Sequence, residues 1–315
     1  MKSFKKPTCI KEAFLRFPLF LMEGALGERL KREYGLDISG EIAMAGLVRT
    51  QAGRDALFAL WRQYAATAAR HRLPFLATTP TRRANCARMS SVGEGAALLA
   101  ENVTFLKETL HGMDVRWYAG GLMGCRGDAY TGEGALDTRD AEVFHAWQAE
   151  ALAAAGADFL MAGIMPTLPE AAGMARAMAA TGLPYIISFT IEKTGRLIDG
   201  TAISDAIAAI DQAASPAPLF YMANCVHPAN VYAALSQPFN RTDTVRERFL
   251  GVQANTSPLS YVELDGAANL QTSEPEALAG WMARLRREMG LRVFGGCCGT
   301  DARHMDAIAR AVTRG

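Results

Sequence analysis

The feature of this sequence that most constrains its fold is an alternation, repeated eight times, of a short β-rich run with a longer stretch of helical period. The candidate strands cover residues 19–23, 75–79, 116–120, 159–163, 185–190, 219–225, 249–255 and 292–297. Candidate helices between and after them include 93–110, 141–155, 168–180, 274–289 and 303–312, and several end at a glycine, the usual C-terminal stop. Strict alternation predicts a parallel sheet with right-handed crossovers, and eight units predict that the sheet closes.

We therefore expect an α/β protein, a (β/α)8 TIM barrel that occupies residues 1–315 as a single domain. A length of 315 residues lies within the range of this fold, and a hydrophobic content of 50% is enough for a large core. A doubly wound open sheet is the alternative. It is less favoured because no G-x-G-x-x-G sequence follows the first candidate strand.

Charge and hydropathy argue against two classes of partner. The chain has 33 Lys and Arg against 32 Asp and Glu and no basic stripe, so we expect neither nucleic acid nor an anionic membrane. No stretch approaches the ~18 uninterrupted apolar residues of a membrane helix. Arg16, Pro18 and Glu23 interrupt the apolar part of the basic N-terminal segment, which argues against a signal peptide. We expect a cytoplasmic protein with small-molecule partners, and whether it forms a homo-oligomer stays open.

Polar and sulfur-containing residues gather at the predicted C-terminal ends of the strands, where barrels of this kind place their active sites. These residues are Glu23, Thr78, Thr79, Gly163, Thr190, Asn224, Cys225, Asn255, Cys297 and Cys298. The pattern predicts a functional site at this rim. We take Glu23, Asn224 and Asn255 as its candidate catalytic residues.

The most specific motif is the sequence GGCCGT at 295–300, which ends strand eight and precedes the last helix. Adjacent thiolates can bind one metal ion from the same turn, while the flanking glycines let the backbone bend. Thr300 or Asp301 is expected to cap the helix, whose N-terminal partial charge favours thiolates. Cys225 ends strand six, roughly 10 Å from strand eight. Two cysteine side chains and Zn–S bonds of ~2.3 Å can close most of that gap.

Three thiolates favour zinc among the common divalent cations and leave one tetrahedral position open, as a catalytic zinc requires. The predicted ligands of Zn²⁺ are Cys225, Cys297 and Cys298. Ordinary structural roles are expected for the remaining thiols and for the nearby histidine, which are Cys9, Cys86, Cys125 and His227.

These motifs resemble those of the homocysteine S-methyltransferase family, zinc-dependent barrels that include betaine-dependent and S-methylmethionine-dependent enzymes. GGCCGT and the Asn-Cys pair at 224–225 carry the resemblance. The run at 21–27 is similar to the family's Asp-Gly-x-Met-Gly start, the Thr-Pro-Thr at 79–81 resembles its Thr-Asn-Thr turn, and Asn255 matches the Asn that ends strand seven. The resemblance covers most of the chain. It implies that zinc binds the three cysteines and that a small-molecule donor methylates a thiol, homocysteine by default, which gives methionine.

The sequence departs from the family at three places. Glu23 replaces an Asp, and Gly163 begins a Gly-Ile-Met-Pro run where the family has Glu-Thr-Ile-Pro. In the family these two acids help hold the amino group of homocysteine, so we expect Gly163 to leave a space and to relax selection for that group. Arg82 and Arg83 follow the Thr-Pro-Thr turn, where an aromatic residue is more usual, and the family's early Trp has no counterpart. These arginines either hold an anionic tail of a substrate or are solvated loop residues. Our predicted substrate-binding residues are therefore Glu23, Thr79, Gly163, Arg82 and Arg83.

Three alternatives to homocysteine methylation stay open. The same site could methylate a different thiol. It could instead catalyse hydrolysis or C–S cleavage, although no obvious general base accompanies the cysteines in the sequence. A non-enzymatic zinc barrel would need a closed site with four ligands, and three convincing ligands are visible.

Overall fold

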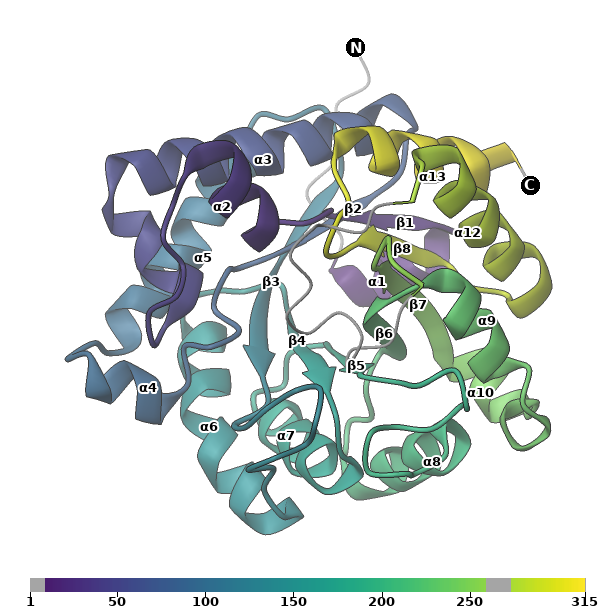
Figure 1. Ribbon diagram of the computed structural model, residues 1–315. Coiled ribbons are helices and arrows are strands. Elements are labelled where there is room, and N and C mark those ends of the chain that lie inside the picture. Colours follow the sequence, from purple (N-terminus) through teal and green to yellow (C-terminus); the bar gives the residue numbers. More distant parts are fainter. Residues whose placement is uncertain (1–8, 259–272, 315) are drawn as a thin grey trace.

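In the computed structural model, which describes residues 9–258 and 273–314, eight parallel strands form a closed barrel in sequence order (Figure 1). The last strand pairs with the first, so the predicted barrel is confirmed and the open sheet is wrong. The strands are β1 (Phe20–Met22), β2 (Phe75–Thr78), β3 (Trp117–Gly124), β4 (Phe159–Met165), β5 (Tyr185–Phe189), β6 (Phe220–Val226), β7 (Phe249–Ala254) and β8 (Val293–Gly296).

Helices surround the ring of strands (Figure 1). Those that follow β1 to β4 are α2 (Gly27–Tyr34), the 3-10 helix η1 (Ala43–Arg49), α3 (Gln51–Arg70), α4 (Cys86–Ser91), α5 (Ala96–Leu110), α6 (Thr138–Ala154) and α7 (Leu168–Ala180). Those that follow β5 to β8 are α8 (Ile203–Ala213), α9 (Pro228–Leu235), the 3-10 helix η2 (Pro238–Asn240), α10 (Asp243–Arg248), α12 (Pro275–Met289) and α13 (Ala302–Arg314). The bounds of α7 are those that the sequence predicts, and the other predicted helices agree to within a few residues.

Apolar side chains form two cores, one between strands and helices and one inside the barrel. The inner core includes Phe20, Phe159 and Phe220, all fully buried. A further helix, α1 (Ile10–Arg16), covers this inner core at the N-terminal end of the barrel.

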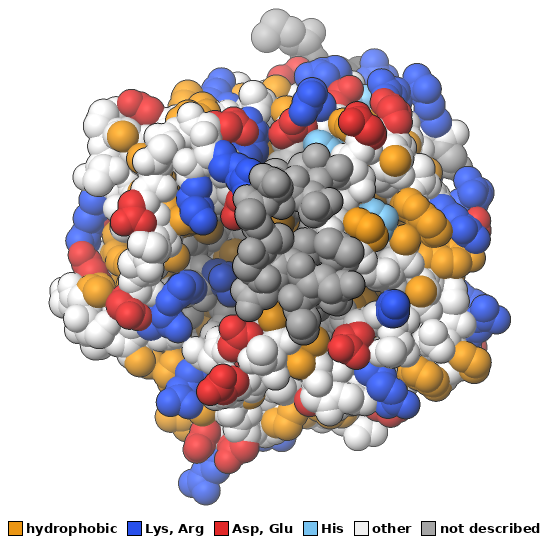
Figure 2. Space-filling view, in the orientation of Figure 1, with side chains coloured by type: hydrophobic (Ala, Val, Ile, Leu, Met, Phe, Trp, Pro, Cys, Tyr) orange, Lys and Arg blue, Asp and Glu red, His pale blue; other side chains and the backbone are white. Residues whose placement is uncertain are grey.

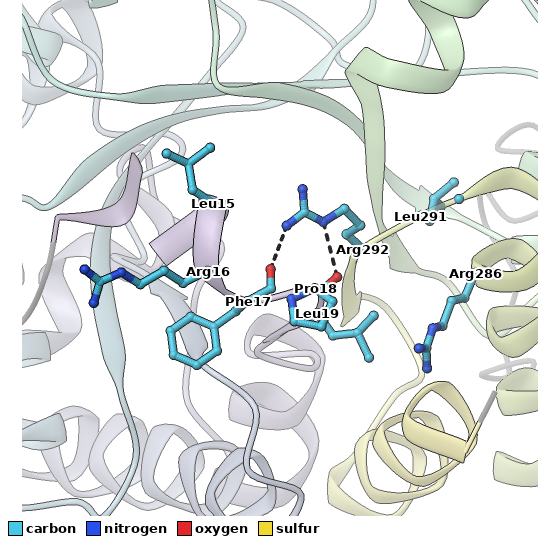
Figure 3. A pocket seen from close by; sticks show the side chains of 9 residues that line it. Leu15, Arg16, Phe17, Pro18, Leu19, Arg286, Leu291 and Arg292 are labelled. Atoms are coloured by element: carbon cyan, nitrogen blue, oxygen red, sulfur yellow. Dashed lines mark hydrogen bonds between the residues drawn. The ribbon is translucent and has the colours of Figure 1, made fainter. Parts of the chain in front are cut away.

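Helix α1 is fixed by aromatic stacking and by one arginine. The Phe14 ring stacks on Phe20 and Phe220, with ring centroids 5.0 and 4.9 Å away. Arg292, directly before β8, donates hydrogen bonds to the carbonyl oxygens of Phe14 and Phe17, both at 2.6 Å, and of Pro18 at 3.2 Å. The close-up shows this arginine reaching the chain segment that joins α1 to β1 (Figure 3).

Two strands carry an irregularity near their C-terminal ends. Ile164 in β4 has φ +57° and Cys225 in β6 has φ +56°, and the pairing register shifts next to each. A left-handed backbone costs a residue other than glycine about 1–3 kcal/mol, and bulges of this kind re-aim a side chain. Both strands, and β3, extend beyond the ends that the sequence predicts.

The surface around the C-terminal end of the barrel mixes charges. Acidic and basic side chains are interspersed over this face, with no large area of one sign (Figure 2). Within residues 9–258 and 273–314, no helix is both long enough and apolar enough to cross a membrane.

Candidate metal centre and active site

The two adjacent cysteines follow β8 and are held by the backbone of the neighbouring strand. The N–H of Cys297 donates to the carbonyl oxygen of Ala254 at 2.7 Å. The carbonyl oxygen of Cys298 accepts the N–H of Thr256 at 3.1 Å. The turn after β8 is therefore tied to the end of β7, which fixes both side chains at the rim.

The flanking residues let this turn pass close to its neighbours. A Cβ atom on Gly296 would lie 2.8 Å from Cβ of Thr300, and Gly299 has φ +84°, which favours glycine. Asp301 caps α13, because its Oδ1 accepts the backbone N–H groups two and three residues later, at 2.9 and 3.1 Å. Of the two predicted caps, Asp301 is therefore the one used, while the Thr300 hydroxyl donates to the carbonyl oxygen of Cys297 at 2.7 Å.

The structure brings the three predicted sulfur ligands together. Sγ of Cys298 lies 3.7 Å from Sγ of Cys225 and 4.0 Å from Sγ of Cys297, and all three lie within 4.8 Å of one another. A tetrahedral zinc with Zn–S bonds of ~2.3 Å separates its sulfurs by about 3.8 Å. The spacing therefore fits one metal ion. Among the described residues, no histidine, carboxylate or further cysteine joins the group.

The residues predicted to stay outside the metal site do so. His227 caps the N-terminus of α9, where its Nδ1 accepts the N–H of Ala229 at 3.2 Å. Free thiols outside the cluster are Cys9, Cys86 and Cys125.

Hydrogen bonds to sulfur distribute charge unevenly over the cluster. Donation from Cys297 and Cys298, and then from Tyr130 and Asn255, holds the pKa of Cys225 well below its usual range. Hydrogen bonding with Cys225 and burial raise the pKa of the other two thiols. Three thiolates together need a bound cation, which is the charge that a divalent metal supplies.

Glu23 directly follows β1, and only one of its two carboxylate oxygens accepts hydrogen bonds from the described residues. Oε1 accepts the backbone N–H of Thr78 at 3.1 Å and its hydroxyl at 2.6 Å, while Oε2 is buried and has no partner among the described residues. The Glu23 carbonyl accepts the N–H of Gly296 at 2.9 Å, which ties this residue to the cysteine turn. Burial raises the pKa of Glu23 to about 7, although the bonds from Thr78 oppose the shift.

Asn224 provides a second buried oxygen that accepts no hydrogen bond from the described residues. Its Nδ2 donates to Oε1 of Gln253 at 2.5 Å, which orients the amide and leaves Oδ1 buried without a partner among the described residues. Asn224 lines the same cavity of about 390 Å³ as Glu23, Cys297 and Cys298. Buried acceptors usually find donors, so the two free oxygens indicate a ligand that donates hydrogen bonds.

Asn255, the third candidate catalytic residue, contacts the sulfur cluster and not the cavity. Its Nδ2 donates to Sγ of Cys225 at 3.6 Å, and its Oδ1 accepts the N–H of Ser257 at 2.9 Å. Asn255 is buried and is not among the residues that line the cavity. Its geometry suits holding Cys225 better than contact with a substrate.

Thr79 and Gly163, two of the predicted substrate-binding residues, line the cavity, and their neighbours limit what each can contact. The Thr81 hydroxyl donates to the carbonyl oxygen of Leu122, so the Thr79 hydroxyl donates its only proton to Thr81 and also accepts the N–H of Leu122. It has no proton left for a ligand. A Cβ atom on Gly163 would lie 2.9 Å from Cδ1 of Leu122. Gly163 lines the cavity, but the end of the Leu122 side chain occupies part of the space beside it and would have to move to admit a larger residue.

Arg82 and Arg83 also line this cavity, and neither forms an ion pair or hydrogen bond with another described residue. Both side chains are partly exposed, and Nε of Arg83 is buried, so substrate binding and a solvated loop position both stay open for the pair. The structure thus places all five predicted substrate-binding residues around one cavity.

Sequence reasoning missed two residues of the site. Tyr130 lies in the aperiodic connection between β3 and α6, and its hydroxyl donates to Sγ of Cys225 at 3.4 Å. No pattern in the sequence marks it. Gln253, which orients Asn224, is a polar residue inside the otherwise apolar strand β7. A polar residue near the end of an apolar strand could have been predicted to belong to the site.

Comparison with known proteins places this site in a family. Residues 20–312 match the family described as homocysteine S-methyltransferase, a span that contains every strand and all three cysteines of the cluster. The chain belongs to the homocysteine S-methyltransferase family. The resemblance inferred from GGCCGT and the Asn-Cys pair is thereby confirmed, and with it the class of enzyme, a methyltransferase.

Solved structures with the same fold include the homocysteine methyltransferase MmuM from Escherichia coli. Its oxidized form has a TM-score of 0.76 at 21% identity, covering 94% of this chain and 97% of that chain. The metallated form has a TM-score of 0.73 at 21% identity, covering 97% and 99%. At this identity the likeness is one of fold.

A methionine synthase from Mycobacterium leprae (strain TN) is 33% identical over 146 residues. The match covers 45% of this chain but 11% of that protein, so the chain corresponds to a small part of the longer relative.

Proposed function

We propose that this protein is a zinc-dependent S-methyltransferase that moves a methyl group from a small-molecule donor to homocysteine and so forms methionine. The observation that carries the proposal is a group of three sulfurs at tetrahedral spacing, two of which, those of Cys297 and Cys298, line one cavity with Glu23 and Asn224, whose free oxygens are buried. Cys225, Cys297 and Cys298 would hold the zinc. When bound there, zinc supplies a Lewis acid that binds the acceptor sulfur and lowers the pKa of its thiol.

Asn255 and Tyr130 support Cys225 rather than the substrate. Each donates a hydrogen bond to Sγ of Cys225, at 3.6 and 3.4 Å. Such donors fix the direction of a ligand and moderate its charge, and their loss typically weakens metal binding or activity by about 10–100-fold.

Glu23 and Asn224 suit the ammonium group of an amino-acid thiol. An ammonium group offers three N–H donors, and the cavity offers Oε2 of Glu23 and Oδ1 of Asn224. A positive charge beside Glu23 favours its ionised form, so acceptor binding should lower the pKa of this carboxyl from about 7. Thr78 and Gln253 hold the two acceptors in place.

The transfer itself needs orientation more than acid or base chemistry. The acceptor thiol releases its proton to solvent as it binds, its sulfur attacks the methyl carbon, and the bond from that carbon to the donor breaks with its electron pair left on the donor. A neutral thioether and the demethylated donor result. The cavity lined by Glu23, Asn224 and the two adjacent cysteines supplies this alignment.

A matrix of thiol acceptors against methyl donors, read by the mass of the methylated product, tests this proposal. We expect zinc-loaded protein to convert homocysteine to methionine with at least one donor, and the Cys297→Ser/Cys298→Ser protein to convert none. Methylation of other thiols in preference to homocysteine would reassign the acceptor. Failure of every pair with fully loaded protein would contradict the proposal.

One observation favours a second candidate, zinc-dependent hydrolysis or C–S cleavage. The pKa of Glu23 near 7 suits a general base at neutral pH, which the sequence alone does not reveal. Release of a thiol from thioesters or thioethers, in the absence of any acceptor thiol, would support this reaction. The methyltransferase proposal predicts no such release. A purely structural zinc is not favoured, since the described residues provide three ligands and no fourth.

A further inference from the structure

A second cavity, of about 560 Å³, adjoins the first and is rich in arginine. Arg82, Arg83, Arg88 and Arg126 line it, and we call it the arginine lobe. Arg82, Arg83 and Tyr130 line both cavities, so the two are joined along these side chains.

Two of these arginines lack the partners that arginines elsewhere in the described chain commonly have. Arg82 and Arg83 form no ion pair or hydrogen bond within residues 9–258 and 273–314, and Nε of Arg83 is buried. Burial, and then the like charges of Arg88 and Arg82, lower the pKa of Arg83. Placing adjacent cations in a partly buried position is unfavourable unless an anion joins them.

The acidic groups nearby offset this charge only in part, because Asp128 attracts Arg82 and Glu41 attracts Arg83 without forming an ion pair with either. Asp128 lines the lobe, but its Oδ1 already accepts the backbone N–H groups of Tyr130 and Thr131, at 2.8 and 2.7 Å. Glu41 pairs with Arg88 at 3.1 Å, across partly exposed side chains. Four arginines and two acids, Asp128 and Glu133, line the lobe, which leaves it positive.

Tyr130 connects this positive lobe to the sulfur cluster. Its hydroxyl lies 3.4 Å from Sγ of Cys225, and its side chain lines both cavities. An extended molecule can therefore place one end beside the cysteines and the other end among the arginines. Glu23 lines only the first cavity, so the lobe extends away from the group assigned to the acceptor.

We propose that the methyl donor carries an anionic tail, a carboxylate or a phosphate, that binds in the arginine lobe to Arg82 and Arg83. The planar guanidinium groups match either anion through paired N–H donors. This inference rests on the proposed function, because it names a property of the donor. The tail stays unchanged in the reaction: the bond between methyl and donor breaks, its electron pair stays on the donor, and the S–CH3 bond forms on the acceptor.

Direct binding tests the lobe without requiring turnover. Isothermal titration calorimetry with glutarate and with inorganic phosphate would compare the wild-type protein, Arg82→Gln/Arg83→Gln, and the control Arg139→Gln, which removes an exposed charge from α6. We expect the double variant to bind at least about 10-fold more weakly, as for loss of charged hydrogen bonds, and the control to change by less than about two-fold. The tighter of the two probes identifies the tail chemistry. Equal affinities in all three proteins would overturn the proposal.

A pair of sulfonium donors tests the assignment to the donor. Dimethylsulfoniopropionate has a carboxylate tail, whereas trimethylsulfonium has none. With homocysteine as acceptor, we expect the wild-type protein to favour the first by at least about 10-fold in kcat/KM, and the double variant to reduce that preference to about two-fold. The KM for homocysteine should stay within about two-fold. A raised KM for homocysteine with an unchanged donor preference would show that the arginines bind the acceptor, which overturns the proposal.

The two readouts separate this inference from the proposed function. Anion binding that depends on the arginines, without methyl transfer from any donor, would refute the proposed function and leave the lobe as an anion site. Methyl transfer without such anion binding would refute the arginine lobe alone.

Discussion

The two ends of this barrel differ in whether their polar side chains bind other parts of the chain or line a cavity beside the sulfur cluster. At the N-terminal end, Phe14 stacks on two core aromatics, and Arg292 donates to three backbone carbonyl oxygens. At the C-terminal end, Glu23 and Asn224 keep buried oxygens without partners in the described chain, and Cys225 has a left-handed backbone. The N-terminal end also has a buried nitrogen without a partner among the described residues, Nη1 of Arg286, but the free oxygens of Glu23 and Asn224 belong to residues that line the cavity beside the cysteines.

This difference teaches where stability and function reside. Strain and unused polar groups destabilise a protein, and they persist at sites where a ligand or a reaction uses them. Substitutions at the C-terminal end should therefore reduce methyl transfer with little change in stability. Substitutions at the N-terminal end should do the reverse.

The largest expected effect comes from removing a sulfur ligand. Cys225→Ser should lose bound zinc and lower the rate of methyl transfer by more than about 100-fold, beyond the usual effect of a residue that only supports a ligand. Metal analysis and turnover measure the two quantities, and the melting curve should still show a cooperative transition. Cys86→Ser, outside the cluster, should keep its zinc. Full zinc occupancy in Cys297→Ser/Cys298→Ser would contradict the assignment of the ligands.

Glu23→Gln should have the next largest effect, confined to acceptors with an amino group. Losing one charged contact should raise KM for homocysteine by at least about 10-fold. The des-amino thiol 4-sulfanylbutanoate should change by less than about two-fold, because it has no ammonium to lose. If the carboxylate is only structural, the variant will melt at a lower temperature and treat both thiols as the wild-type protein does.

The pH dependence of acceptor choice should be smaller but specific. Below about pH 7 the Glu23 carboxyl is protonated and binds an ammonium weakly, so the preference in kcat/KM for homocysteine over the des-amino thiol should rise as pH increases through about 7. Taking the ratio cancels much of the pH dependence of the thiols themselves. Glu23→Gln should flatten the rise, and a rise that persists in this variant would assign it to another group.

The same carboxyl should affect stability with a definite sign. Its pKa is about 7 in the folded protein and about 4.3 when unfolded, so the unfolded chain releases the proton first. Its contribution to the free energy of unfolding is therefore present below about pH 4.3 and is lost as pH rises to about 7. Comparing urea unfolding of the wild-type protein and Glu23→Gln across this window should show a shallower decline in the variant.

Phe14→Ala should affect catalysis least and stability most. Truncating a nearly buried aromatic residue that stacks on Phe20 and Phe220 should lower the free energy of unfolding by about 3–5 kcal/mol. Below the melting temperature, kcat/KM should stay within about two-fold of the wild-type value. A large loss of activity in the folded variant would show that the two ends are coupled.

The parts that were predictable from the sequence are those that depend on periodicity and on strand ends. Eight alternating units were enough to predict the barrel, and the strand-end rule placed Cys225 beside Cys297 and Cys298. The contents of the cavity were less predictable. Leu122 lies beside Gly163 because β3 continues past its predicted end, which depends on pairing with β4 rather than on local sequence.

The most direct test of this account is X-ray absorption at the zinc edge, on loaded protein with and without homocysteine. Three cysteines and an open position predict three sulfurs at about 2.3 Å and one lighter atom, changing to four sulfurs when homocysteine is added. A zinc shell with four sulfurs before the thiol is added, or one that homocysteine leaves unchanged, would contradict an open site that binds the acceptor.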